Sequence, residues 1–328
     1  MKYIITGIGG HLGHAITKAL LERGERVRGL LLPGQQPNFT GVEYIWGDVT
    51  QPESLLPLFR YDEEPVCLIH AAGMVDATGR TSQKLYDVNV GGTKNILALC
   101  REHQVDKLVY VSSVHAIPEH RKPTVQSEIS QFDPALVEGG YAKTKAEATQ
   151  AVLNAAASGL PAVVVHPSGI LGPYDDGQNH LVQLVRDFAL GKLPACVKGG
   201  YDFVDVRDVA QGCILAAEHG VPGECYLLTG QYNEIREILG ITAEMTGRKK
   251  PVVLPTILAR MGVPLLDFLA KRQKRRPLYT NYSLDTLGSR TRFSHQKASE
   301  VLGYRTRDIQ TTVRDTLRWL NLYPATNG

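Results

Sequence analysis

The stretch Thr6-Gly7-Ile8-Gly9-Gly10-His11-Leu12-Gly13 follows directly on Lys2-Tyr3-Ile4-Ile5, and together they decide the fold. The first residues predict a short buried strand. Beyond the glycines, apolar residues recur at the spacing of one helix face, and Gly24 stops the helix. These apolar residues are Leu12, Ala15, Ile16, Ala19 and Leu20. A strand, a glycine-rich turn and an amphipathic helix in this order are typical of a dinucleotide-binding unit.

The glycines of this turn explain why it would hold a pyrophosphate. Gly7, Gly10 and Gly13 are three residues apart. Without side chains they permit a tight turn, close approach of backbone N–H groups to phosphate, and close packing of helix on strand. We expect them to bind the cofactor together with His11 and Leu12. The alternative is a glycine-rich turn without a ligand.

Short β-branched runs alternate with helical stretches through the first half of the chain, which predicts a doubly wound, Rossmann-type α/β fold with a parallel sheet. The expected strands are Lys2–Thr6, Arg26–Leu32, Val42–Trp46, Val66–Ala71, Lys107–Ser112 and Pro161–His166. They are apolar almost throughout, as expected for strands covered on both faces.

Beyond His166 the sequence pattern changes. Regular structure is interrupted by Pro167, Gly169, Gly172-Pro173 and Gly177, before a helix expected at 181–190. We predict a cofactor domain and a smaller, mixed α/β substrate-binding lobe. The domain covers 1–170 and about 201–218, whose strand and helix could rejoin the sheet, and the lobe covers 171–200 and 219–328. The apolar stretch Leu258–Leu269 could line a substrate pocket, or simply pack in the core.

Composition limits the partners. The 328 residues carry a net charge of +3, which is too mild to indicate nucleic acid, and they contain no apolar run of the length that crosses a membrane. Strand-like sequence from Lys2 leaves no room for an export signal, so we expect a cytoplasmic protein. The scattered cysteines predict buried thiols and no metal site. We interpret the basic run Lys271–Arg276 as a solvated helix end.

Tyr141-Ala142-Lys143-Thr144-Lys145 sets a tyrosine and a lysine four residues apart at the start of an expected helix, so both side chains leave one face. A phenol can donate a proton during ketone reduction if a nearby cation favours its anion. Lys145 is that cation, since the offset of Lys143 points it away. The strand before them ends in Ser112-Ser113. We favour Ser113 for holding the substrate oxygen, although spacing does not separate it from Ser112.

The ribose and adenine ends give weaker signals. An NAD enzyme usually ends its second strand with a carboxylate, but Leu30-Leu31-Leu32 stands there. NAD(P) is therefore the expected cofactor, with a slight preference for NADP, whose phosphate Gln35 or Gln36 could reach. At the end of the third strand, Asp48-Val49 is placed to meet the adenine. A turn-capping aspartate is the alternative.

The motifs together resemble the extended short-chain dehydrogenases/reductases, the NAD-dependent epimerase/dehydratase superfamily. They are the glycine turn, His70-Ala71-Ala72, Asn89-Val90-Gly91-Gly92-Thr93, Ser112-Ser113, Y-x-x-x-K, His166-Pro167, Gly172-Pro173 and Phe203 to Ala210. The resemblance implies that Ala71 and Ala72 flank the adenosine and that Lys145 also holds the nicotinamide ribose. It implies that the backbone after Pro167, through Ile170, meets the carboxamide. Asn89 would be a structural or proton-relay position.

Within that family the chain looks most like dihydroflavonol-reductase and β-hydroxysteroid-dehydrogenase members. The segments that carry this likeness are Asp202 to Ala210, Tyr226 to Gly230 and Lys297 to Tyr304. It implies interconversion of a secondary alcohol and a ketone. The alternative is a sugar-nucleotide epimerase or dehydratase with transient hydride transfer, in which Arg186 and Lys271–Arg276 could meet a diphosphate. A lesser alternative is a non-catalytic dinucleotide sensor. His115 could line the pocket or lie in an exposed loop, and a homodimer is compatible with the sequence.

Overall fold

A seven-stranded parallel sheet forms the centre of the molecule, in a computed structural model that describes residues 1–61, 64–76, 78–119, 124–175, 177–193, 195–261, 263, 272, 280–288 and 291–323. The strand order is β11-β7-β5-β4-β1-β2-β3. The strands are β1 (Lys2–Thr6), β2 (Arg26–Leu31), β3 (Val42–Trp46), β4 (Val66–His70), β5 (Lys107–Val111), β7 (Ala162–Pro167) and β11 (Cys225–Leu228). The six predicted strands are confirmed to within one residue at each end.

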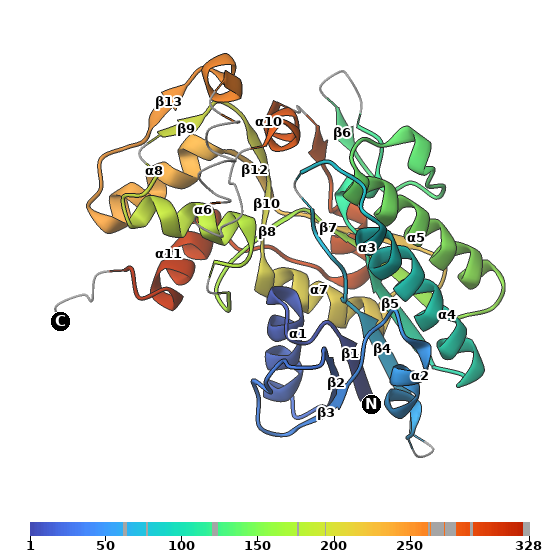
Figure 1. The fold of residues 1–328 in the computed structure, drawn as a ribbon. Coiled ribbons are helices and arrows are strands. Elements are labelled where there is room, and N and C mark those ends of the chain that lie inside the picture. The colour runs from blue at the N-terminus through green and yellow to red at the C-terminus, as the bar shows by residue number, and fades with distance from the viewer. Residues whose placement is uncertain are drawn as a thin grey trace.

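Helices cover both faces of this sheet (Figure 1), so each face has its own apolar core. α1 and α7 pack on one face, and α2, α4 and α5 on the other. Their bounds are α1 (His11–Glu22), α2 (Pro52–Leu55), α4 (Gly92–Glu102), α5 (Gly140–Ala157) and α7 (Val206–His219). Between β4 and α4 lie α3 (Gln83–Tyr86) and the turn Asp87–Gly91. The predicted Rossmann-type fold is confirmed.

The second lobe has its own core, built from α6, α8 and α11. A three-stranded sheet and a two-stranded pair, with orders β12-β10-β8 and β13-β9, lie beside these helices (Figure 1). The elements are β8 (Gly169–Leu171), α6 (His180–Ala189), β9 (Ala195–Val197), β10 (Gly200–Asp205), β12 (Gln231–Glu234), α8 (Ile235–Thr246), β13 (Val252–Leu254), α10 (Asn281–Gly288) and α11 (Ile309–Trp319). A short pair, β6 (Val125–Gln126) with β14 (Arg292–Phe293), lies apart from them.

One expectation about the sheet is wrong. The strand at 201–205 does not rejoin the large sheet, because β10 pairs with β8 and β12 instead. Only α7, which follows it, packs on the large sheet. The edge position is taken by β11, which runs parallel to β7 although it lies in the range predicted for the lobe. Both strands are short and mostly buried, and periodicity alone does not tell which sheet a strand joins.

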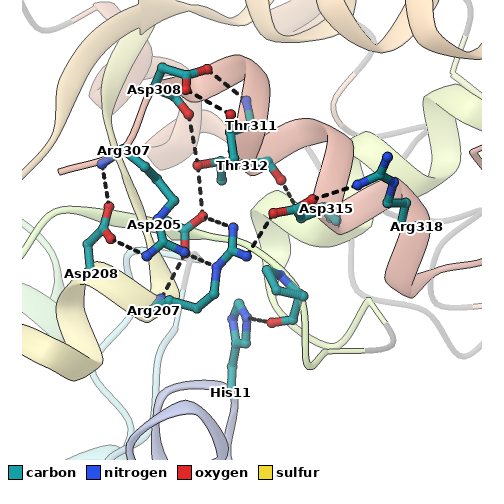
Figure 2. A network of polar contacts seen from close by, with 12 residues as sticks. His11, Asp205, Arg207, Asp208, Arg307, Asp308, Thr311, Thr312, Asp315 and Arg318 are labelled. Atoms are coloured by element: carbon teal, nitrogen blue, oxygen red, sulfur yellow. Dashed lines mark hydrogen bonds and ion pairs between the residues drawn. The ribbon is translucent and has the colours of Figure 1, made fainter. Parts of the chain in front are cut away.

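A buried polar cluster fastens the lobe to α7 (Figure 2). Asp205 caps α7 and accepts from the Arg207 side chain at 2.8 Å and 2.9 Å and from the Thr312 hydroxyl of α11 at 2.8 Å. Arg207 also contacts Asp315 of α11 at 2.7 Å. Burial acts to raise the pKa of Asp205, but the Arg207 guanidinium outweighs it and holds that pKa below its usual range. The cluster joins the end of β10, where the lobe meets the sheet, to α11.

Two predicted features fall wholly or mainly outside the described residues. Most of Leu258–Leu269 and all of Lys271–Arg276 except Arg272 lie there, so their roles stay predictions. In the part of the chain that the structure describes, no helix is long and apolar enough to cross a membrane. The five cysteines are buried free thiols, as predicted.

Candidate active site

The predicted site residues gather at the carboxyl edge of the large sheet. The glycine turn follows β1, Asp48 follows β3, Ala71-Ala72 follow β4 and Ser112-Ser113 follow β5. Pro167 is the last residue of β7. In parallel sheets of this kind, ligands bind beyond this edge, close to where the strand order reverses. Here the order reverses between β1 and β4.

The glycine turn fits a dinucleotide phosphate. Gly7 has a φ of +74°, and a Cβ there would lie 2.7 Å from the backbone nitrogen of Ala72. A Cβ on Gly13 would lie 2.1 Å from the Gly7 carbonyl oxygen, so helix and turn approach as closely as predicted. Gly10 begins α1 without a side-chain cap, and the first turn holds no acidic residue. The first-turn N–H groups and the positive end of the helix are therefore available to an anion.

A buried histidine braces this turn against the loop after β4. The His70 ring lies 2.6 Å from the Thr6 hydroxyl and 3.2 Å from the Thr93 hydroxyl. Because the Thr93 hydroxyl donates to the Asn89 carbonyl, it accepts from His70 Nε2, and Thr6 donates to Nδ1. Thr6 in turn accepts from the N–H of Ala72 at 3.2 Å. Burial lowers the pKa of His70 to about 3, so the ring stays neutral and the chain of bonds keeps one direction.

At the adenine end the side chains make local contacts. Asp48 Oδ1 accepts from the backbone N–H and hydroxyl of Thr50 at 2.9 Å and 2.8 Å, which is the turn-capping contact weighed above. The Val49 side chain packs against Gly92 at the start of α4. Gln35 lies beside Gly9, and its Oε1 accepts from the N–H of Leu32 at 3.0 Å. This arrangement leaves an uncharged amide at the end of β2.

The start of α5 carries Tyr141 and Lys145 on its inward face, whereas Lys143 is exposed, as the spacing predicts. Tyr141 is partly buried. Burial raises its pKa to about 12, and a hydrogen bond with Ser113 opposes the rise. The phenol is therefore protonated at neutral pH and lies in contact with the hydroxyl that follows β5.

The two serines have different surroundings. The Ser112 hydroxyl lies 2.6 Å from the Thr149 hydroxyl, which itself donates to the Lys145 carbonyl. Ser112 therefore points into α5 and donates to Thr149. Ser113 accepts from the N–H of His115 at 3.2 Å, and its hydroxyl makes no such contact with α5 through Thr149. The two serines therefore differ in their surroundings, and Ser113 stays the expected partner of the substrate oxygen.

Lys145 is buried one turn beyond Tyr141. Its Nζ donates to the Val111 carbonyl at 2.8 Å and lies 3.5 Å from the Tyr110 hydroxyl. The ammonium also sits 5.0 Å from the centre of the Tyr110 ring. Burial lowers the pKa of Lys145 to about 8, so the amine is protonated in most molecules at neutral pH. A buried cation beside the end of β5 suits both a phenolate and ribose hydroxyls.

The Asn89 side chain forms hydrogen bonds through both its oxygen and its nitrogen. Its Oδ1 accepts from the N–H of Met74 at 2.8 Å, and its Nδ2 donates to the Met74 carbonyl and to Thr144 at 3.0 Å each. These contacts tie the loop after β4 to α5. They fit a structural role for Asn89, which is one of the two roles expected for it. His166, just before Pro167, lies 3.0 Å from the Ser113 carbonyl and ties the ends of β5 and β7 together. Ile170, in β8, pairs with Val204 of β10.

The second lobe adds aromatic residues that the sequence did not single out. Tyr201, from β10, has its hydroxyl 2.8 Å from His115 Nε2, and the two rings stack at 5.5 Å. The His115 ring centre lies 6.0 Å from that of Tyr141. Tyr282, from α10, donates to the Glu138 carbonyl just before α5. His115 is therefore partly buried beside the phenol and is not an exposed loop residue.

A period-two reading of β5 could have found part of this site. Tyr110 and Ser112 lie on one side of the strand, toward α5, where they meet Lys145 and Thr149. Ser113 falls on the other side of that alternation. The contacts of Tyr201 and Tyr282 leave no comparable signal, because they depend on how the second lobe folds back.

Comparison with known proteins identifies the family. The model of the NAD dependent epimerase/dehydratase family matches residues 3–229. "Sterol demethylase protein B" of Methylococcus capsulatus is 31% identical over 97% of this chain and 98% of its own length. A "4-hydroxy-2-methyl-3-oxo-4-farnesyl-3,4-dihydroquinoline-1-oxide ketoreductase" of Stigmatella aurantiaca is 32% identical over 97% of this chain and 96% of its own.

A solved structure extends the likeness to the whole fold. The crystal structure of gox2253 covers 97% of this chain and 97% of its own, with a TM-score of 0.81 and 30% identity. The match therefore includes the second lobe as well as the large sheet. From its motifs, its fold and these matches, the chain is an NAD(P)-dependent enzyme of the NAD dependent epimerase/dehydratase family, the extended short-chain dehydrogenases/reductases.

Proposed function

We propose that the enzyme interconverts a ketone and a secondary alcohol, with Tyr141 as the acid and base. The observation that carries this proposal is that Tyr141 and Lys145 lie one turn apart on the inward face of α5, with Lys145 donating to the Val111 carbonyl at the end of β5, directly before Ser112-Ser113. Two hydroxyls at this edge, those of Tyr141 and Ser113, can both bind one carbonyl oxygen, which polarises the carbonyl bond. In the direction of reduction, the proton moves from the Tyr141 hydroxyl to that oxygen.

The remaining residues prepare this proton transfer. When bound, the nicotinamide supplies the hydride to the carbonyl carbon, or accepts it in the reverse direction. Burial keeps the Tyr141 phenol protonated until a substrate oxygen takes the proton. Lys145 is the cation that stabilises the phenolate left behind, and it also holds the nicotinamide ribose. Asn89 and His70 position the loop after β4 and need not exchange protons.

The substrate that suits this site is an apolar ring ketone. His115 and Tyr201 stack beside Tyr141, and Tyr282 closes against the start of α5, so the surroundings of the phenol are aromatic. The names of two relatives point in the same direction, because one refers to sterols and the other to a farnesylated dihydroquinoline. Sterols and isoprenoid rings bind through apolar area.

We also propose that NADP is accepted at least as well as NAD. The end of β2 presents leucines and the Gln35 amide, so no carboxylate at that position repels a 2′-phosphate.

The test is a panel of steroid, dihydroflavonol and sugar-nucleotide substrates, with NADH and NADPH each as cofactor. The near-ultraviolet absorbance of the reduced nicotinamide reports net reduction. We expect net oxidation of the cofactor with at least one apolar ring ketone. Turnover of a sugar nucleotide without any net change in absorbance would overturn the proposal in favour of an epimerase.

A further inference from the structure

The His11 side chain points away from the phosphate turn, although its backbone belongs to that turn. Its Nε2 lies 2.8 Å from the carbonyl oxygen of Pro173 and its Nδ1 lies 3.2 Å from Nδ2 of Asn179. Both partners lie in the loop 172–179, of which the structure describes every residue except 176, and which leads from β8 to α6 in the second lobe. Figure 2 shows His11 below the Asp205–Arg207 pair, with its ring bonded to a carbonyl oxygen.

The directions of both hydrogen bonds are fixed by their surroundings. A carbonyl oxygen only accepts, so His11 Nε2 carries the proton. Asn179 Oδ1 caps α6 by accepting from the N–H of Leu181 at 2.8 Å, which turns its NH2 group toward His11. His11 Nδ1 therefore accepts. A protonated ring would present an N–H to an NH2 group, so the contact requires neutral His11.

The loop that His11 holds is itself braced. Asp175 Oδ1 accepts from the N–H of Gly177 at 2.7 Å and of Asn179 at 2.9 Å. Tyr174 has a φ of +76°, a conformation unusual for a residue with a side chain. Its ring stacks on His14 of α1 at 5.3 Å and meets Trp319 of α11 at 5.3 Å. The strained backbone is thus held by contacts from both α1 and the lobe.

Burial favours the neutral form of His11 and outweighs the charged groups around it. Burial lowers its pKa, against the carboxylates of Asp175 and Asp205, which favour the cation. Arg207 pairs with Asp205 and reduces that second influence. Because the pKa of His11 in the folded protein lies below the usual value for histidine, its contact with Asn179 is fully formed at any pH above that usual value. It is lost as the pH falls through the lowered pKa.

We propose that His11 is a positioning residue that couples the dinucleotide site to the loop 172–179, so that cofactor binding orders the start of α6. The coupling acts through the first turn of α1, whose N–H groups would bind the cofactor phosphates while its His11 and His14 rings hold the loop. By reciprocity, weakening the loop contact also weakens cofactor binding by the same factor. The inference needs only dinucleotide binding and does not rest on the proposed ketone chemistry.

Hydrogen exchange with and without saturating NADPH tests the coupling. In the unaltered protein we expect the cofactor to slow exchange at residues 181–184 by about fivefold or more, the lower end of typical couplings. His11→Phe keeps a ring but removes both bonds, and Asn179→Ser keeps a good helix cap but does not reach His11. In both variants this protection should fall below about twofold, while the glycine turn remains protected.

Asn233→Ser is the matched control. Asn233 lies in β12 of the same lobe, and its side chain donates to the nearby Gln231 carbonyl. The control should keep the full protection at 181–184. Equal protection in the control, in His11→Phe and in Asn179→Ser would overturn the proposal. If His11→Phe does not fold, Asn179→Ser decides the outcome.

Asn179→Asp tests the protonation state. The aspartate can still cap α6, but it presents an acceptor to His11 Nδ1 and therefore favours the cation. We expect the His11 resonance to titrate at a higher pH in this variant. Protection of 181–184 by the cofactor should then persist in acid, where the unaltered protein loses it. Identical titration and identical pH dependence in both proteins would overturn the assigned contact.

Discussion

The β5–α5 edge and the second lobe contribute to one site in different ways. At the edge, Tyr141 and Lys145 come from α5 and Ser113 from the end of β5, and buried hydrogen bonds fix most of their surroundings. The lobe contributes Tyr201, whose ring stacks on His115 beside Tyr141, and Tyr282, whose hydroxyl donates to the Glu138 carbonyl just before α5. The difference suggests that the edge carries the chemistry and the lobe selects the substrate.

The sharpest test of the edge is Tyr141→Phe. Removal of the proton donor should lower kcat between about 10² and 10⁴-fold, while NADPH binding is retained. Turnover by the enzyme with its preferred ketone and calorimetric titration of the cofactor measure the two effects. Tyr86→Phe is the control, because Tyr86 ends α3 and its hydroxyl donates to Glu147 of α5 at 2.7 Å. A Phe variant as active as this control would remove Tyr141 from its role.

Substitution of the two serines tests whether Ser113, and not Ser112, binds the substrate oxygen. Ser113→Ala removes one of the two groups on the substrate oxygen and should lower kcat by about 10²-fold. Ser112→Ala should leave kcat within about twofold, but should lower the free energy of unfolding by about 1 kcal/mol through the lost bond to Thr149. Steady-state kinetics and urea unfolding of both variants give the comparison. If Ser112→Ala lost activity and Ser113→Ala kept it, the roles assigned to the two serines would have to be exchanged.

Cofactor choice depends on the edge beyond β2. Leu32→Asp places a carboxylate where NAD enzymes usually have one, and should shift the ratio of NADP to NAD affinity about tenfold toward NAD. Leu32 is 48% exposed, so the change should be tolerated. Leu56→Asp, at a similarly exposed position away from the glycine turn, is the control. An unchanged ratio would show that β2 does not approach the ribose.

The lobe should give the smallest effect. Tyr201→Phe removes the hydroxyl that bonds His115 but keeps the ring, so KM for the ketone should rise about two- to tenfold, with kcat little changed. Tyr232→Phe on the adjoining strand β12 is the control. A loss of kcat as large as that of Ser113→Ala would mean that the lobe takes part in the chemistry. The division of roles between the edge and the lobe would then be wrong.

The sequence predicted the edge better than the lobe for a physical reason. Strands and their following turns are local, so the spacing of Gly7, Gly10 and Gly13, or of Tyr141 and Lys145, carries their geometry directly. Choosing between Ser112 and Ser113 needed the position of α5, which only the packed structure supplies. Periodicity also assigned β10 to the wrong sheet, because partner choice depends on residues distant in sequence.

Contacts across long separations show the limit most clearly. Tyr201 is 86 residues from His115, and Asn179 is 168 residues from His11. His11 had been expected to serve the cofactor, and only its backbone is placed to do so. Its ring serves the lobe, a role that no local pattern in the glycine turn encodes.

The most direct measurement uses reduced cofactor with deuterium at the transferable position of the nicotinamide, together with a ketone accepted in the panel. The account predicts product alcohol with one deuterium on the former carbonyl carbon for each cofactor oxidised, and no such product from Tyr141→Phe at a comparable rate. Product formed without deuterium, or label that stays with the enzyme while substrate is isomerised, would contradict it.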